Sequence, residues 1–185
     1  MSGLSLSLLG PFEAALDGEP INHRFEANKV RALLAFLAVE AHLYPRGHPR
    51  RILAALFWPG KPERAALSNL RNALSNLRKA IGDRGAIGTR GAQDGGSVFP
   101  FLLVTRETIQ FNPASRHRLD VATFQALVEG YSDPQELQQA VDLYRGEFLQ
   151  GFFVRDSPEF EEWVRFQRER LHAQALRALD ALAAH

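Results

Sequence analysis

The chain has 185 residues, of which 45% are hydrophobic, and its formal net charge is +1. It contains no cysteine, which excludes a disulfide framework, a thiolate metal site and a cysteine nucleophile. No apolar run approaches the ~18 residues that a membrane span needs, and the N-terminus lacks the basic start and long apolar stretch of a signal peptide. These features favour a cytoplasmic protein with no membrane partner.

The small net charge hides a strong asymmetry along the chain. Residues 1–118 contain 16 Lys and Arg against 9 Asp and Glu, a net charge of +7, whereas residues 119–185 contain 6 against 12, a net charge of −6. Within residues 46–90 the count is 10 against 2, or +8. Such asymmetry suggests a basic module for a polyanion joined to an acidic module with another task.

The N-terminal segment is predicted to form a small antiparallel sheet. LSLSLLG (4–10) alternates leucine with serine, a period of two that is typical of a half-buried strand. FEAALDGEPI (12–21) continues with a second alternating run and then Asp17-Gly18, a strong hairpin-turn signal.

Three helices are predicted next. NKVRALLAFLAVEAHL (28–43) has leucines at helical spacing and Asn28 as its cap. RRILAALFW (50–58) is a short second helix that ends at Pro59 and Gly60. The third, PERAALSNLRNALSNLRKAIGD (62–83), has a proline in its first turn and ends at Gly82.

The rest of the chain is predicted to be a loop, a hairpin and a helical segment. Residues 84–100 are glycine-rich and unpatterned, as expected of a mobile loop. FLLVTRETIQF (101–111) indicates a hairpin with Arg106 and Glu107 at its tip, followed by a connector. From Leu119 onwards the pattern is helical over 120–130, 133–152 and 157–185, with Ser157 as the cap of the last helix. The order predicts an α+β fold: a winged helix-turn-helix with an N-terminal antiparallel sheet and a C-terminal hairpin, followed by an all-α segment.

The third helix carries an almost exact repeat, LSNLRNA and then LSNLRKA. Its apolar positions 67, 70, 74, 77 and 81 form one stripe, and the opposite face is polar with hardly an acid. Arginine and lysine neutralise phosphates, and asparagine and arginine make bidentate contacts with base edges in the major groove. We therefore predict phosphate contacts from Arg50, Arg51, Arg64, Arg71, Lys79 and Arg106, and base-edge contacts from Ser68, Asn72, Ser75 and Asn76, with Arg71 also eligible.

Two plainer interpretations stand beside this one. Most charged runs on amphipathic helices are solvated faces. The hairpin can also be plain structure, with Ile109 and Phe111 covering the helices and Arg106 in solvent, rather than a wing whose Arg106 reaches a minor groove or a phosphate. The local charge of +8 and the order of elements favour DNA binding.

The same residues resemble a known family. LLGPFEAALDG, KVRALLAFLAV, ILAALFWPGKPERAALSNLRNALSNLRKAIGD, LLVTRETIQFNP and LDVATFQALVEG are similar to bacterial transcriptional activators of the antibiotic regulatory protein type. These join a response-regulator-type winged helix to a bacterial transcriptional activation domain, and LYRGEFLQGF and FEEWVRFQRERL look like the opening of that second domain. The resemblance divides the chain into residues 1–115, a winged-helix DNA-binding domain, and residues 119–185, the N-terminal part of a helical, TPR-like activation domain.

The resemblance also implies partners. Such proteins bind direct repeats in double-stranded DNA as side-by-side protomers and help RNA polymerase to engage a poor promoter, so a homodimer on DNA is expected. By matching motif, residues 62–82 are the recognition helix, and the turn with Trp58, Gly60 and Lys61 lies near polymerase. The family usually continues with further helix pairs beyond the point where this chain stops, so either a fragment or a short natural form fits the pattern.

No catalytic constellation is visible in the sequence. The six histidines have no i, i+4 pair of the kind that holds a metal on a helix, the glycines have neither Rossmann nor P-loop spacing, and Glu161 and Glu162 are adjacent and so point apart. We predict no enzyme activity, metal or cofactor, and interpret Trp58 and Trp163 as packing residues. The rival hypothesis is a protein-interaction or oligomerisation module without DNA binding, in which the acidic segment folds back onto the basic helix and masks it.

Overall fold

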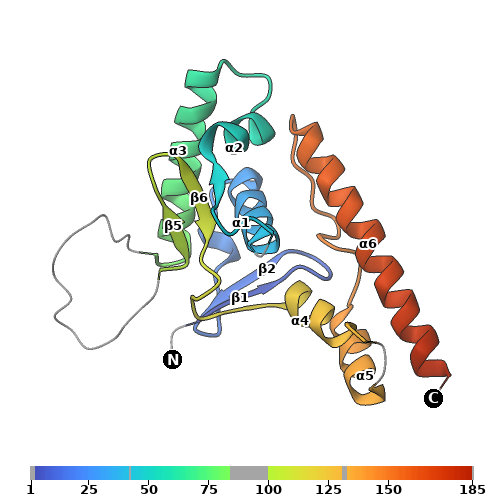
Figure 1. Cartoon of the computed structure of the whole chain (residues 1–185). Helices are drawn as coiled ribbons and strands as arrows, with labels where there is room; N and C mark the ends of the chain where they lie inside the picture. The colour runs from blue at the N-terminus through green and yellow to red at the C-terminus, as the bar shows by residue number, and fades with distance from the viewer. Residues whose placement is uncertain (1–2, 42, 84–99, 131–132, 185) are drawn as a thin grey trace.

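The computed structural model describes residues 3–41, 43–83, 100–130 and 133–184, and it has a mixed α+β architecture (Figure 1). The predicted loop lies outside the described residues except for Pro100. Among the residues that are described, no helix has the length and apolarity needed to cross a bilayer.

A four-stranded sheet combines three N-terminal strands with one strand at the boundary between residues 1–118, which we call the basic half, and residues 119–185, which we call the acidic half. It contains β1 (Leu4–Ser7), β2 (Glu13–Leu16), β3 (Glu19–Pro20) and β7 (His117–Leu119), in the order β3-β2-β1-β7. The predicted hairpin turn is confirmed, because Asp17 and Gly18 have φ of 57° and 86°, as a two-residue turn of this kind requires. The predicted antiparallel pairing of the N-terminal strands is confirmed for β1 with β2 and for β2 with β3, whereas β7, which pairs in parallel with β1, was not predicted. A three-residue strand within a polar connector has no alternation by which to recognise it.

The three predicted helices are confirmed as α1 (Asn28–Glu40), α2 (Arg50–Phe57) and α3 (Glu63–Ala80). The prediction for Asn28 was wrong by one position. Ala27 precedes the helix and provides no side-chain cap, whereas Asn28 lies in the first turn and accepts a hydrogen bond from Arg31. A single 3₁₀ turn, η1 (Asn22–Arg24), connects β3 to α1.

A second, three-stranded sheet contains the predicted hairpin. Its strands are β4 (His48–Pro49), β5 (Leu102–Val104) and β6 (Thr108–Phe111), in the order β4-β6-β5. The carboxylate of Asp83, directly after α3, accepts hydrogen bonds from the backbone N–H groups of Phe101 and Leu102 at 3.3 and 3.1 Å. This buried carboxylate joins the end of α3 to the start of the hairpin.

The acidic half contains α4 (Asp120–Leu127), α5 (Pro134–Leu143) and α6 (Pro158–Ala183). The predicted helix over 133–152 was too long, because residues 144–157 run back to the first sheet without helical structure. Leu149 there has a positive φ of 49° and donates a hydrogen bond to the carbonyl of Leu8 at 2.8 Å. Hydrogen bonds with residues directly after β1, far away in the sequence, thus take the place of the predicted helical ones.

The two halves share one hydrophobic core. The Phe57 ring of α2 lies 5.2 Å from that of Phe160 on α6, between centroids, and the indole N–H of Trp163 donates to Glu40 of α1 at 2.7 Å. Ser157 directly precedes α6, as predicted, but it makes no side-chain cap. Its hydroxyl instead donates to the carbonyl of Phe57 at 2.9 Å. The long helix α6 therefore packs on α2 and α1 (Figure 1).

The burial of His48 on β4 predicts how the stability of the folded protein depends on pH. Its ring is 5% exposed and lies against Phe36 and Tyr44, and its Nε2 has no hydrogen-bond partner among the described residues. Burial lowers the pKa of His48, so the unfolded chain takes up a proton more readily than the folded one. The stability from neutral His48 is present above pH ~6.5 and is lost as the pH falls, by up to about 1.4 kcal/mol per pH unit.

We expect His48→Phe to flatten the fall in unfolding free energy between pH 7 and pH 5, measured by urea titration. His23→Gln, at an exposed position, serves as the control and keeps the wild-type slope. Parallel curves for the wild type and His48→Phe would contradict a buried neutral imidazole.

Candidate nucleic-acid interface

Helix α3 buries one face and exposes the other. Leu70, Leu77 and Ala80 are at most 1% exposed, and they belong to the face that packs against α1 and α2. A helix with so regular an apolar stripe has only one rotation that buries it. The opposite side, which we call the polar face of α3, is exposed and comprises Arg64, Ser68, Arg71, Asn72, Ser75 and Lys79.

Among the described residues, nothing makes a polar contact with the polar face of α3. None of its six side chains forms a hydrogen bond or an ion pair with the described residues. Its three cations also have no acidic neighbour on the helix except Glu63 in the first turn. The face can therefore bind an external anion without first giving up a hydrogen bond or an ion pair to any residue that the structure describes.

Asn76 is a correction to the predicted interface. It is only 8% exposed; its carbonyl oxygen accepts the backbone N–H of Glu26 at 3.1 Å, and its amide donates to the carbonyl of Arg24 at 3.5 Å. Asn76 thus holds α3 against the segment before α1 and is not available to a base edge. It sits at the border of the helix wheel, where the helical period alone does not separate buried from exposed.

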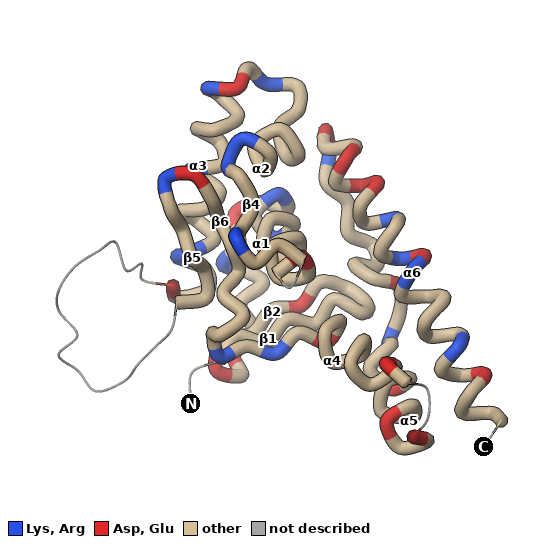
Figure 2. Tube along the Cα trace, viewed as in Figure 1, with Lys and Arg blue, Asp and Glu red and all other residues tan. Residues whose placement is uncertain are grey.

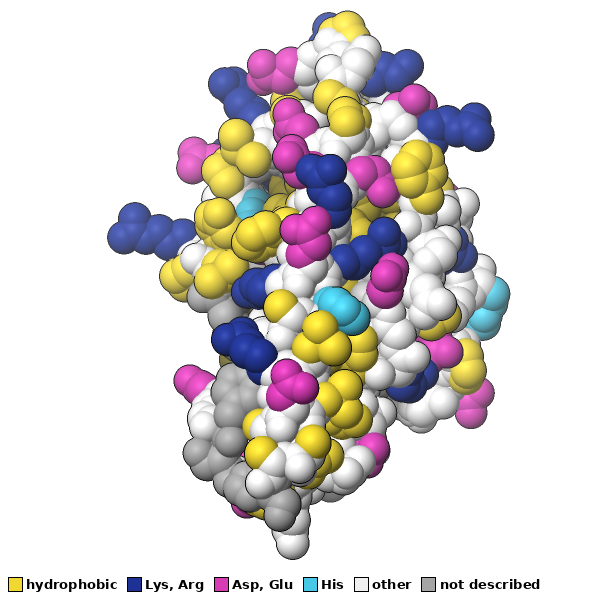
Figure 3. Space-filling model, turned by 90° about the vertical axis from the view of Figure 1, so that its right-hand side faces the viewer, with side chains coloured by type: hydrophobic (Ala, Val, Ile, Leu, Met, Phe, Trp, Pro, Cys, Tyr) yellow, Lys and Arg dark blue, Asp and Glu magenta, His cyan; other side chains and the backbone are white. Residues whose placement is uncertain are grey.

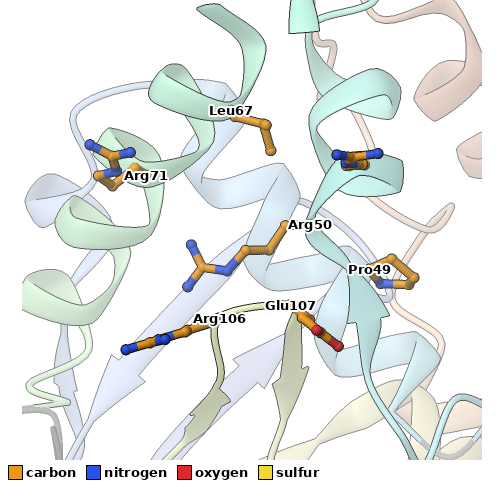
Figure 4. Close-up of a pocket in the computed structure, with 7 residues that line it drawn as sticks. Pro49, Arg50, Leu67, Arg71, Arg106 and Glu107 are labelled. Carbon is orange, nitrogen blue, oxygen red and sulfur yellow. The ribbon is translucent and has the colours of Figure 1, made fainter. Parts of the chain in front are cut away.

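A groove beside α3 brings together arginines that are far apart in the sequence. Its volume is about 570 Å³, and we call it the arginine groove; it is lined by Pro49, Arg50, Arg51, Leu67, Arg71, Arg106 and Glu107. Figure 4 shows Arg50 between Arg71 of α3 and Arg106 of the hairpin, with the three guanidinium groups directed to the same side. Partial burial, and then the positive charge of Arg71, lower the pKa of Arg50. Like charges gathered in this way favour an anionic ligand.

The tip of the hairpin is held by local hydrogen bonds. The Thr105 hydroxyl oxygen accepts the backbone N–H groups of Glu107 and Thr108 at 3.1 and 2.9 Å. Arg50 donates from Nε to the carbonyl of Thr105 at 3.0 Å, and its backbone N–H donates to the carbonyl of Glu107 at 2.8 Å. These contacts tie the tip to the start of α2 and leave Arg106 exposed at its end.

Arg51 is placed less favourably than predicted. Its Nε lies 3.0 Å from a carboxylate oxygen of Glu63, with side chains 79% and 60% exposed. An ion pair this exposed is worth little, so a phosphate can displace it, but Glu63 competes for the cation.

The turn after α2 is well defined in the structure. The side chain of Trp58 is half-buried, and the Lys29 ammonium lies 5.4 Å from its ring centroid. The prediction that Trp58 is a packing residue is confirmed, since it packs against the core. Gly60 and Lys61, by contrast, are exposed.

The chain has the fold of EmbR from Mycobacterium tuberculosis, a structure solved in complex with a low-affinity phosphopeptide. The two superpose with a TM-score of 0.70 at 22% sequence identity. The match covers 99% of this chain and 45% of the other, so this chain spans about half the length of that EmbR chain. No protein-family model and no curated protein sequence matches the chain.

The acidic half does not mask the polar face of α3 in this structure. Helix α6 lies on the side of α2 and α1, away from α3 (Figures 1 and 2). The polar-face residues remain exposed with all described residues present. The masking contact of the rival hypothesis is therefore not formed among the described residues, which also hold no cluster of three or more His, Asp or Glu suited to a metal ion.

The sequence pattern missed the roles of two residues that shape this site. Leu67, predicted to belong to the apolar stripe, is half-buried and lines the arginine groove, and Asp83 fixes the base of the hairpin. Both residues shape the site together with segments more than fifteen residues away in the sequence. Helical periodicity reports only which side of one helix is apolar, so it does not reveal these roles.

Substitution of Asn76 tests its assignment as an anchor. Asn76→Ala leaves the N–H of Glu26 without its partner, and we expect a loss of about 1–2 kcal/mol in the free energy of unfolding. Asn72→Ala, one turn away and exposed, is the matched control and should change stability by no more than about 0.5 kcal/mol. Equal losses from the two substitutions in chemical denaturation would refute the assignment.

Proposed function

We propose that this chain is a sequence-specific DNA-binding transcriptional regulator, with α3 as its recognition helix. The observation that supports this most strongly is the polar face of α3, which is exposed, has no polar partner in the part of the chain that the structure describes, and lies beside three convergent arginines. The major groove of B-DNA is about 12 Å wide and admits one α-helix, so α3 fits there with its apolar face still in the core.

Within this proposal the residues divide into two groups. Arg50, Arg71 and Arg106 bind backbone phosphates through the arginine groove, with Arg64 and Lys79 on the helix and Arg51 once released from Glu63. Ser68, Asn72 and Ser75 face base edges, where an asparagine amide pairs with adenine. Phosphate contacts position the helix, and base contacts select the sequence.

The fold supports a finer division of the chain. Sheet, three helices and hairpin make a winged helix-turn-helix over residues 1–115, and residues 119–185 begin a TPR-like activation domain. The resemblance to activators of the antibiotic regulatory protein type, together with the fold shared with EmbR, supports this arrangement. It also supports binding of paired protomers to direct repeats and a contact of Gly60 and Lys61, beside Trp58, with RNA polymerase.

One observation favours a protein-binding role for the acidic half. Phe166, Leu176 and Leu179 on α6 are 60%, 49% and 45% exposed. In Figure 3 hydrophobic side chains lie between charged ones on the face of the molecule that α6 forms. A protein partner on α6 is compatible with DNA on α3, because the two surfaces lie on different sides of the molecule (Figure 1).

Salt and base preference test the assignment of α3. Sites are first selected from randomised duplex DNA with the wild-type chain, and affinities are then measured on a selected and a scrambled duplex. With about six phosphates engaged, affinity should fall on the order of a thousandfold between 50 and 200 mM salt. Failure of the wild-type chain to retain any duplex at low salt would favour the interaction-module hypothesis.

Two substitutions separate the roles of the residues. Asn72→Ala should lower the ratio of selected to scrambled affinity by roughly tenfold or more, because one bidentate base contact is lost. Arg106→Gln should weaken both duplexes alike and reduce the salt slope by about one. Arg155→Gln, which removes an exposed charge before α6, is the control. An unchanged affinity ratio for Asn72→Ala would refute its assignment to a base edge.

A further inference from the structure

The 3₁₀ turn η1 lies against α3 on the flank opposite the hairpin. Asn76 of α3 makes its two hydrogen bonds with the backbone of Arg24 and Glu26, in and just after η1. Arg71, on the hairpin side, is five residues earlier, which at 3.6 residues per turn places it about 140° away around the helix axis. The polar face of α3 thus lies between the hairpin on one side and η1 on the other.

The turn η1 is held rigidly in that position. The side-chain oxygen of Asn22 accepts the backbone N–H of Ala14 at 2.8 Å, and Arg31 donates to the carbonyl of Asn22 at 3.0 Å. Directly after the turn, the buried ring of Phe25 packs edge-on against Phe12 with centroids 5.7 Å apart. A segment fixed to β2, α1 and α3 loses little conformational entropy on binding a ligand.

The outward side chains of η1 are not used to hold the described part of the fold together. His23 and Arg24 are exposed, and neither side chain forms a hydrogen bond or an ion pair with the described residues. The backbone carbonyl of Arg24 accepts from Asn76, whereas the guanidinium has no partner in the described ranges. The turn therefore presents a cation and an imidazole from a fixed backbone beside the recognition helix.

We propose that η1 is a second phosphate-binding element, with Arg24 as its main contact and His23 beside it. The inference rests on the proposed function of α3. A helix in the major groove has a phosphate backbone on each side, and the hairpin with Arg106 reaches only one of them. Arg24 then binds the phosphates of the other strand, and Asn76 keeps the distance between this contact and the base-reading side chains constant.

Removal of the Arg24 charge tests the contact. Arg24→Gln should weaken binding to selected and scrambled duplexes by the same factor and lower the slope of log affinity against log salt by about 0.9, the value for one phosphate. Arg155→Gln makes the same change of charge in the segment directly before α6 and should leave the slope at the wild-type value. Arg24→Lys restores a cation and should recover most of the slope, and thermal unfolding should be unchanged in all three variants.

The outcomes separate this inference from the proposed function. If the wild-type chain binds duplex DNA steeply with salt while Arg24→Gln and Arg155→Gln behave alike, the contact at η1 is overturned and the function of α3 stands. If Arg24→Gln changes the affinity ratio between the two duplexes, Arg24 reads bases and the phosphate assignment is overturned. If the wild-type chain retains no duplex at low salt, both proposals fail.

Discussion

Burial of one apolar face of α3 is the constraint on which the rest of the candidate interface depends. The leucine and alanine side chains of that face are almost completely removed from water, and each fully buried leucine contributes about 1.5–3 kcal/mol. That free energy fixes the rotation of the helix about its axis, and Asn76 adds a directional hydrogen bond at the edge of the face. With the rotation of α3 fixed in this way, the six residues of its polar face are exposed.

Three attachments among the described residues hold the hairpin in position. Asp83 holds the start of β5, β4 pairs with β6, and Arg50 joins the hairpin tip to the start of α2. Burial raises the pKa of the Asp83 carboxyl, and its two backbone hydrogen bonds oppose that shift. These three attachments determine where Arg106 lies relative to Arg71, and so they create the arginine groove.

The acidic half acts as a support for the basic half. Asp120 at the start of α4 accepts hydrogen bonds from the backbone N–H groups of Leu8 and Leu9, and Arg168 of α6 donates to the carbonyls of Phe148 and Leu149. Residues 144–157 lie between these two anchors. The acidic half is thereby held on the first sheet and on α2, and its negative charge is kept to the side away from the polar face of α3 (Figure 2).

The sequence by itself determined the order of the elements, the three helices before the hairpin, and the exposed residues of α3 other than Asn76. Periods of 2 and 3.6 residues report which side of an element is apolar, and that is a local property. Only the tertiary structure decided what happens at the edges of those faces: Asn76 and Leu67 lie at the borders of the stripe, where a neighbouring segment decides between burial and exposure. The parallel strand β7, the extended run 144–157 and the placement of η1 beside α3 were decided in the same way, because their hydrogen-bond partners lie far away in the chain.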